Sequence, residues 1–102
     1  MEKFEIGELA NYSIRGDTYP VRVISVSPSG KTVTVCSVSW KVKPEVPREL
    51  GMTLDIDDVA DVETKKDSKP EVFRYSKKYG LHIRSQYFIL RRGFSYHQDP
   101  HV

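Results

Sequence analysis

The chain has 102 residues, of which 38% are hydrophobic and 29% charged, and its formal net charge is +2. This length leaves room for one hydrophobic core and no second domain, so we expect a single domain over residues 1–102. No stretch approaches the roughly 18 apolar residues of a membrane span, residues 1–5 lack the layout of a secretory signal, and the single cysteine excludes an internal disulfide. We therefore predict a cytoplasmic protein without a membrane partner.

Charge and aromatic residues are distributed unevenly along the chain. Residues 1–44 carry six basic and four acidic groups (net +2), residues 45–64 one basic and seven acidic groups (net −6), and residues 65–102 nine basic and three acidic groups (net +6). Seven of the eleven aromatic residues also lie in the last third. The chain therefore has an acidic middle and a basic, aromatic end.

A first β hairpin is indicated by two β-branched runs around a turn. Residues 19–27 and 31–40 are rich in valine, isoleucine and threonine, and residues 28–30 (Pro-Ser-Gly) favour a turn between them. Alternation along the second run would place Val33 and Val35 on one face. The opposite face would carry Thr34, Cys36, Val38 and Trp40.

A second hairpin and a last strand are predicted in the basic third. Residues 71–76 and 81–84 alternate around the turn 77–80, residues 87–91 form another short β run, and residues 95–102 are expected to be a flexible tail. No long amphipathic helix is present to connect parallel strands. These runs predict a mainly β fold, a small barrel or sandwich of five to six antiparallel strands.

The acidic insert, about residues 44–70, has a pattern that leaves its structure open. Residues 41–53 contain two prolines and read as a connector, whereas residues 54–62 allow a short helix, a polar strand or a loop. Residues 63–69 are predicted to be a solvated loop.

Each candidate motif for metal binding or catalysis in the sequence lacks residues that its chemistry requires. A calcium loop beginning at Asp55 needs glycine at its sixth position and glutamate at its twelfth, where the chain has Ala60 and Lys66. His97 and His101 have a zinc-like spacing but no further ligand near them. The single cysteine falls within a predicted strand, where cysteine acts as a small core residue, and neither a nucleophile elbow nor a P-loop occurs. We expect no metal, no cofactor and no catalytic residues.

The basic, aromatic third carries the one positive signal for function. Its lysines and arginines attract phosphate, arginines on strands can bind it in a bidentate manner, and aromatic rings stack on bases with about 1–3 kcal/mol each. The alternative is that the lysines are ordinary solvated turn residues and that aromatic residues of the two strands are core. The candidate ligand-binding residues are Lys77, Lys78, Tyr79, His82, Arg84, Tyr87, Arg91 and Arg92.

The opening Tyr12–Val35, with its turn Ser27-Pro-Ser-Gly-Lys31 between β runs, resembles a group of small phage-encoded proteins of unknown function. Residues 73–80 and 96–100 resemble later parts of the same proteins, and residues 41–70 depart from them. The resemblance implies an SH3-like barrel, a phage or prophage context, and stoichiometric binding, such as sequestration of a nucleotide signal of host immunity.

Two classes of function are therefore expected. The first is a non-enzymatic phage accessory protein that binds or sequesters a nucleotide, a cyclic nucleotide immune signal or single-stranded nucleic acid through its basic, aromatic third. Because a small barrel lacks a deep pocket, such a protein would build one as a homo-oligomer. The second is an inhibitor or adaptor that contacts a host protein through the acidic segment 55–63. A small nuclease or hydrolase ranks third.

Overall fold

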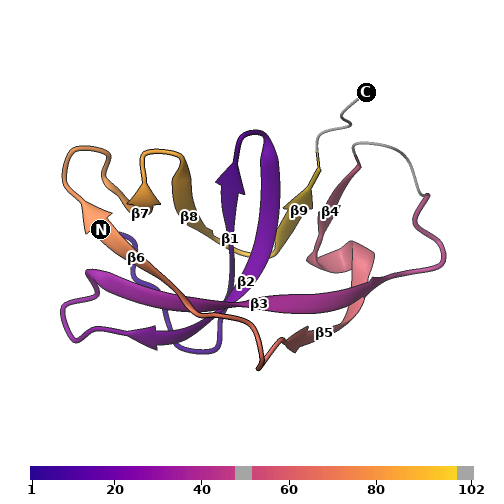
Figure 1. Ribbon diagram of the computed structural model, residues 1–102. Coiled ribbons are helices and arrows are strands. Elements are labelled where there is room, and N and C mark those ends of the chain that lie inside the picture. Colours follow the sequence, from indigo (N-terminus) through magenta and orange to yellow (C-terminus); the bar gives the residue numbers. More distant parts are fainter. Residues whose placement is uncertain (48–51, 99–102) are drawn as a thin grey trace.

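The computed structural model describes residues 1–47 and 52–98 of the chain. Within these ranges the chain forms nine strands and one 3-10 turn (Figure 1). In chain order these are β1 (Leu9–Ile14), β2 (Asp17–Val26), β3 (Thr32–Val42), β4 (Thr53–Asp55), η1 (Ile56–Asp58), β5 (Val59–Thr64), β6 (Glu71–Ser76), β7 (Leu81–Ser85), β8 (Phe88–Arg92) and β9 (Ser95–His97).

Six of the strands close into an antiparallel barrel. Their order is β2-β1-β8-β7-β6-β3, and β3 pairs back onto β2. The remaining strands extend the sheet, because β5 pairs with the second half of β3 and the β9–β4 pair continues from β2. The mainly β fold and the antiparallel barrel predicted from the sequence are confirmed. Of the alternatives for residues 54–62, the chain forms a short strand, a 3-10 turn and the start of β5.

Strand β3 runs the length of the molecule (Figure 1). It contributes to two hydrophobic clusters, one on each of its faces. Val33 and Val35 lie in the barrel core, whereas Val38 and Trp40 lie in a second cluster between β3, β4, β5 and β9. This split follows the alternation predicted for residues 31–40. The barrel core comprises Phe4, Ala10, Tyr12, Val21, Val23, Val33, Val35, Phe73 and Leu90. The second cluster is built around Val38, Leu54, Val59 and Phe94.

Both predicted hairpins are present, with bounds within two residues of the expected ones. Strand β1 is not indicated by the pattern, and it joins β2 through a two-residue loop. Arg15 (φ 48°) and Gly16 (φ 91°) in this loop both have positive φ, which matches the tight turns that suit strand twist. Residues 63 and 64 belong to β5 and not to a loop. Residues 95–97 of the predicted tail form β9, and residues 99–102 lie outside the described ranges.

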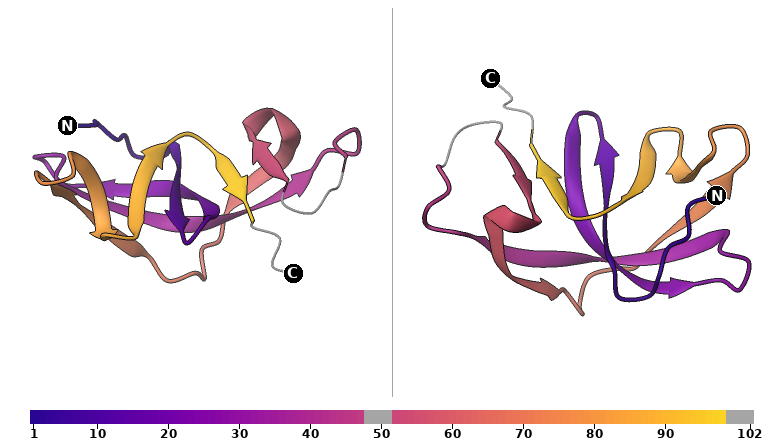
Figure 2. Two further views of the ribbon diagram at one scale, coloured as in Figure 1. Left: turned by 90° about the horizontal axis from the view of Figure 1, so that it is seen from above. Right: turned by 180° about the vertical axis from the view of Figure 1, so that it is seen from behind.

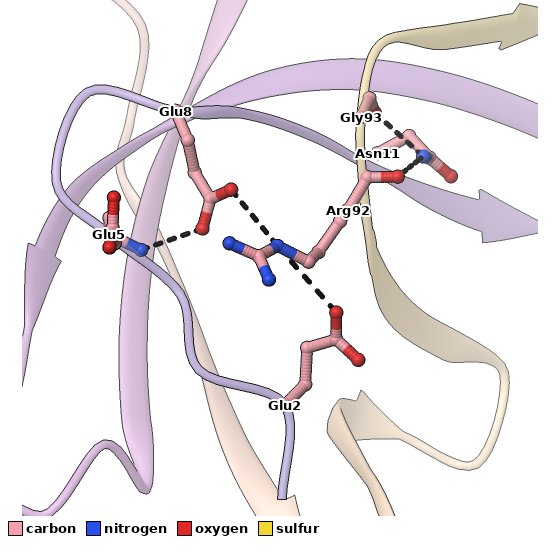
Figure 3. A network of polar contacts seen from close by, with 6 residues as sticks. All are labelled: Glu2, Glu5, Glu8, Asn11, Arg92 and Gly93. Atoms are coloured by element: carbon pink, nitrogen blue, oxygen red, sulfur yellow. Dashed lines mark hydrogen bonds and ion pairs between the residues drawn. The ribbon is translucent and has the colours of Figure 1, made fainter.

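Residues 1–8 cover one end of the barrel, and we call this segment the N-terminal cap. Phe4 is buried at 4% exposure and meets the His82 ring edge-on, with the centroids 5.1 Å apart. Arg92 holds the cap through its Nε, which lies 3.1 Å from Glu8 Oε2 and 3.6 Å from Glu2 Oε1 (Figure 3). The β2–β3 and β6–β7 turns lie at this capped end.

The opposite end of the barrel is the mouth. The pairing places the β1–β2 loop, the β7–β8 turn and the start of β6 there, because Ile14 pairs with Asp17 and Ser85 pairs with Phe88. Among the described residues, no helix has the length and apolar character needed to cross a membrane.

Candidate functional site

A groove of about 570 Å³ lies along the β6–β7 hairpin. It extends over the outer face of the two strands and reaches the mouth at the first residue of β6. We call it the β6–β7 groove. Its lining residues are Pro70, Glu71, Val72, Arg74, Tyr75, Ser76, Ile83 and Arg84.

Strand alternation and a bulge place the two arginines of the groove. Phe73 is fully buried in the barrel, so its neighbour Arg74 points outward and is exposed. The β7–β8 pairing shifts register between Ile83 and Ser85, which leaves Arg84 as the extra residue. Bulges redirect side chains in this way. The Arg84 guanidinium carbon lies 5.9 Å from the centroid of the Phe88 ring, at the mouth.

Glu71 is the acidic member of the groove. Its Oε2 lies 3.4 Å from Arg84 Nη1, and its Oε1 accepts a long hydrogen bond of 3.4 Å from the Tyr12 hydroxyl. Oε2 is buried and accepts no hydrogen bond from any described residue. Burial, followed by the charge of Glu71, raises the pKa of Tyr12 to about 12. Tyr12 is therefore a neutral donor at neutral pH.

The groove keeps a net positive charge despite this carboxylate. Arg74 has no ion pair with any described residue, whereas Arg84 is partly neutralised by Glu71 and its side chain is 49% exposed. Guanidinium groups present several N–H donors in a planar fork that matches phosphate. The groove therefore has the charge and the donors to hold a phosphate group.

The residues predicted for ligand binding do not form one surface. Lys77, Lys78 and Tyr79 form the β6–β7 turn at the capped end, where Lys78 Nζ lies 5.4 Å from the centroid of the Tyr79 ring. Tyr87 is 65% exposed in the β7–β8 turn at the mouth. The two turns lie at opposite ends of β7 (Figure 2, left). Of the eight residues predicted to bind the ligand, Arg84 lines the groove and the other seven do not.

Two further predicted residues are used within the fold. His82 is fully buried, its Nε2 donates to the carbonyl of Gly30 at 2.7 Å, and its ring contacts Phe4 and Tyr75. The ring therefore presents no free face to a ligand outside the barrel. Arg92 holds the N-terminal cap, as described above (Figure 3). Arg91 is exposed on β8 and does not line the groove.

Arg74 and Glu71 were missed as site residues. Arg74 alternates with Phe73 and Tyr75 in the predicted strand 71–76, and this alternation is a signal for its outward direction. Nothing in the sequence indicates that Glu71 meets Arg84 and Tyr12, because that meeting depends on the bulge in β7 and on the missed strand β1.

The acidic segment 55–63 is partly used to build η1. Asp55 caps this turn by accepting from the Asp57 amide at 2.9 Å, and Asp58 accepts from the Asp55 amide at 2.9 Å. Asp61 and Glu63 line a second hollow of about 240 Å³, and Asp61 Oδ2 lies 3.9 Å from Lys41 Nζ. Its other lining residues are Ser39, Trp40 and Lys41. Within the described ranges, no three His, Cys, Asp or Glu side chains are grouped so that they could hold a metal ion.

No family model, curated protein or solved structure matches this chain. The β6–β7 groove and its charges therefore indicate the function. What these groups can do is bind: two arginines attract an anion, and one carboxylate accepts hydrogen bonds.

Proposed function

We propose that the protein is a non-enzymatic binding protein that holds a phosphate-bearing ligand in the β6–β7 groove. The ligand classes that fit are a nucleotide, a cyclic nucleotide signal and single-stranded nucleic acid. The observation that carries the proposal is the pair of arginines in one concave surface, with Arg74 exposed and unpaired among the described residues and Arg84 redirected by a bulge. The excess of basic residues in the last third supports it.

A phage setting would give such binding a purpose. The sequence between Tyr12 and Val35 resembles small phage-encoded proteins, and we propose an SH3-like phage accessory protein that sequesters a nucleotide immune signal in the host cytoplasm. The groove of one chain is open and shallow, so a homo-oligomer that covers it from a second copy would bind more tightly. Analytical ultracentrifugation with and without ligand tests the oligomer.

Binding to the groove is tested by thermal shift and calorimetry at low salt. A ligand that binds only the folded state raises the melting temperature, so nucleotides, cyclic dinucleotides and short oligonucleotides are screened first. Arg74→Ala and Arg84→Gln should each weaken binding of a positive ligand at least about tenfold, because each removes a charge-assisted contact. Arg91→Ala removes an exposed arginine outside the groove and should change the affinity less than about twofold.

Two results would contradict this proposal. One is the absence of a shift with every phosphate-bearing ligand at low salt. The other is an equal loss of affinity in Arg74→Ala and Arg91→Ala, because that would indicate diffuse attraction by surface charge.

A second candidate function is an adaptor that contacts a basic host protein. The observation favouring it is the hollow that Asp61 and Glu63 line beside Lys41. Lys41 Nζ lies 3.9 Å from Asp61 Oδ2, so the three groups together carry one net negative charge, which suits a cationic side chain. The test is a pull-down from host lysate with the double variant Asp61→Asn, Glu63→Gln. Asp55 and Asp58 are left unchanged because they cap η1. Capture that persists in the double variant would count against this site.

A further inference from the structure

Glu71 is the acidic residue among the eight that line the β6–β7 groove. A carboxylate beside two phosphate-binding arginines opposes the binding of any anion, since like charges in a shared site repel. Its ion pair with Arg84 is exposed on the arginine side, where the side chain is 49% exposed, whereas the Glu71 Oε2 atom that it joins is buried. The desolvation of a buried charge offsets much of the attraction within such a pair, so fold stability alone does not account for Glu71.

The oxygens of Glu71 are short of hydrogen-bond donors. Oε2 is buried without a hydrogen bond among the described residues, and Oε1 receives one bond at the long distance of 3.4 Å from Tyr12. A carboxylate can accept about four hydrogen bonds, and an unmet acceptor away from water costs free energy. A ligand that supplies donors would remove this cost.

A phosphate in the groove would also uncover the carboxylate. Arg84 Nη1 lies 3.4 Å from Oε2, and the Arg84 side chain is 49% exposed. A phosphate held by Arg74 would attract the Arg84 guanidinium and draw it away from Glu71. The two oxygens would then be open to the rest of the bound ligand.

From this arrangement we infer that Glu71 makes the groove selective for phosphate ligands that also present two neighbouring hydrogen-bond donors. Two parts of a nucleotide offer such a pair: the N1–H and N2–H edge of guanine, and the 2′,3′-diol of ribose. Either pair matches the two oxygens of one carboxylate. The inference rests on the proposed phosphate-binding function and adds the class of ligand.

Four 5′-monophosphates separate the two sources of donors. GMP has the guanine edge and the diol, 2′-deoxy-GMP has only the guanine edge, AMP has only the diol, and 2′-deoxy-AMP has neither. Calorimetry on the full chain should show that 2′-deoxy-GMP or AMP binds at least about tenfold more tightly than 2′-deoxy-AMP, as expected for charge-assisted hydrogen bonds. Whichever of the two shows the preference identifies the donor pair.

The variant Glu71→Gln assigns the preference to this side chain. Glutamine keeps the size of Glu71 and an oxygen for the Tyr12 hydroxyl, but it places an amide where the second acceptor was. The preference should fall to within about twofold, while 2′-deoxy-AMP binds equally well or better because the opposing charge is gone. Glu45→Gln, which changes an exposed carboxylate outside both hollows, is the control and should leave the preference intact.

The outcomes distinguish a failure of this inference from a failure of the proposed function. Equal binding of all four nucleotides with loss in Arg74→Ala would overturn the inference and leave the proposed function standing. A preference that survives Glu71→Gln would also overturn it. If none of the four nucleotides binds, the inference falls, and the proposed function falls with it once the wider ligand screen is negative too. The melting temperature of Glu71→Gln shows that the variant is folded.

Discussion

Ion pairing and burial separate residues that look alike in the sequence. Arg74 and Arg92 both lie on strands of the basic third, yet Arg74 is exposed in the groove and Arg92 is held by Glu2 and Glu8. His82 is fully buried against Gly30, while Tyr79 is 44% exposed in a turn. Charge and residue type therefore indicate the region of the groove, whereas the direction of each side chain determines whether the residue lines it.

Tyr12 should make the stability of the protein depend on pH above neutrality. Burial and Glu71 raise its pKa to about 12 in the folded chain, whereas an unfolded tyrosine titrates near 10. Between these values the folded state retains a proton that the unfolded state releases, so the free energy of unfolding falls as pH rises. The contribution, about 2–3 kcal/mol, is fully present below about pH 10 and is lost as pH passes 12.

Urea unfolding at a series of pH values, in the wild type and in Tyr12→Phe, measures this effect. Lysine and arginine titrations occur in both proteins, so they cancel in the comparison. We expect the wild type to lose stability more steeply than Tyr12→Phe from about pH 9 to about pH 11.5. Parallel slopes would show that Tyr12 titrates normally.

At the scale of elements, the sequence predicts best where local signals are strong. The two hairpins have β-branched runs and clear turns, and they form as expected. Strand β1 was missed because residues 9–14 hold only two strong β formers, Tyr12 and Ile14, among leucine, alanine, asparagine and serine. Its strand conformation is fixed by pairing with β2 and β8, a contact between distant segments that local propensity does not contain.

The candidate site also depends on contacts between distant segments that local sequence does not contain. The region 71–84 was recognised from its charge, but the bulge at Arg84 and the meeting of Glu71 with Tyr12 arise from sheet register. Register is set by the whole barrel and shifts side chains between faces. The groove therefore could not be derived from the residues of its own hairpin.

The N-terminal cap should loosen when its ion pairs are removed. Arg92→Gln breaks the contacts to Glu2 and Glu8, which are partly exposed, and should cost about 0.5–1 kcal/mol of stability. The amides of Gly7 and Val23, which bond across the cap to Val23 O and Glu8 O at 2.8 and 2.9 Å, should exchange hydrogen faster.

Hydrogen exchange followed by mass spectrometry on residues 1–23 checks this expectation. Arg91→Gln is the matched control, because Arg91 is the neighbouring exposed arginine and has no ion pair to a described residue. Equal exchange in the two variants would show that the ion pairs of Arg92 do not hold the cap. Ligand affinity should be unchanged in Arg92→Gln, since Arg92 lies outside the groove.

For the whole molecule, the decisive feature is that one strand serves both hydrophobic clusters. The eleven residues of β3 provide Val33 and Val35 to the barrel core and Val38 to the second cluster. A strand cannot leave one cluster and keep its pairing in the other without straining a shared backbone. The barrel and its extension should therefore unfold together, in one cooperative transition.

The single tryptophan allows a direct test of this coupling. Trp40 belongs to the second cluster, so its fluorescence reports that cluster, while far-ultraviolet circular dichroism reports all strands. Leu54→Ala, at a site with 2% exposure in the second cluster, should lower the stability by about 2–4 kcal/mol. Both signals should shift to lower urea by the same amount, and Val35→Ala in the barrel core should likewise shift both. If Leu54→Ala moves the fluorescence transition alone, the two clusters fold independently and β3 does not couple them.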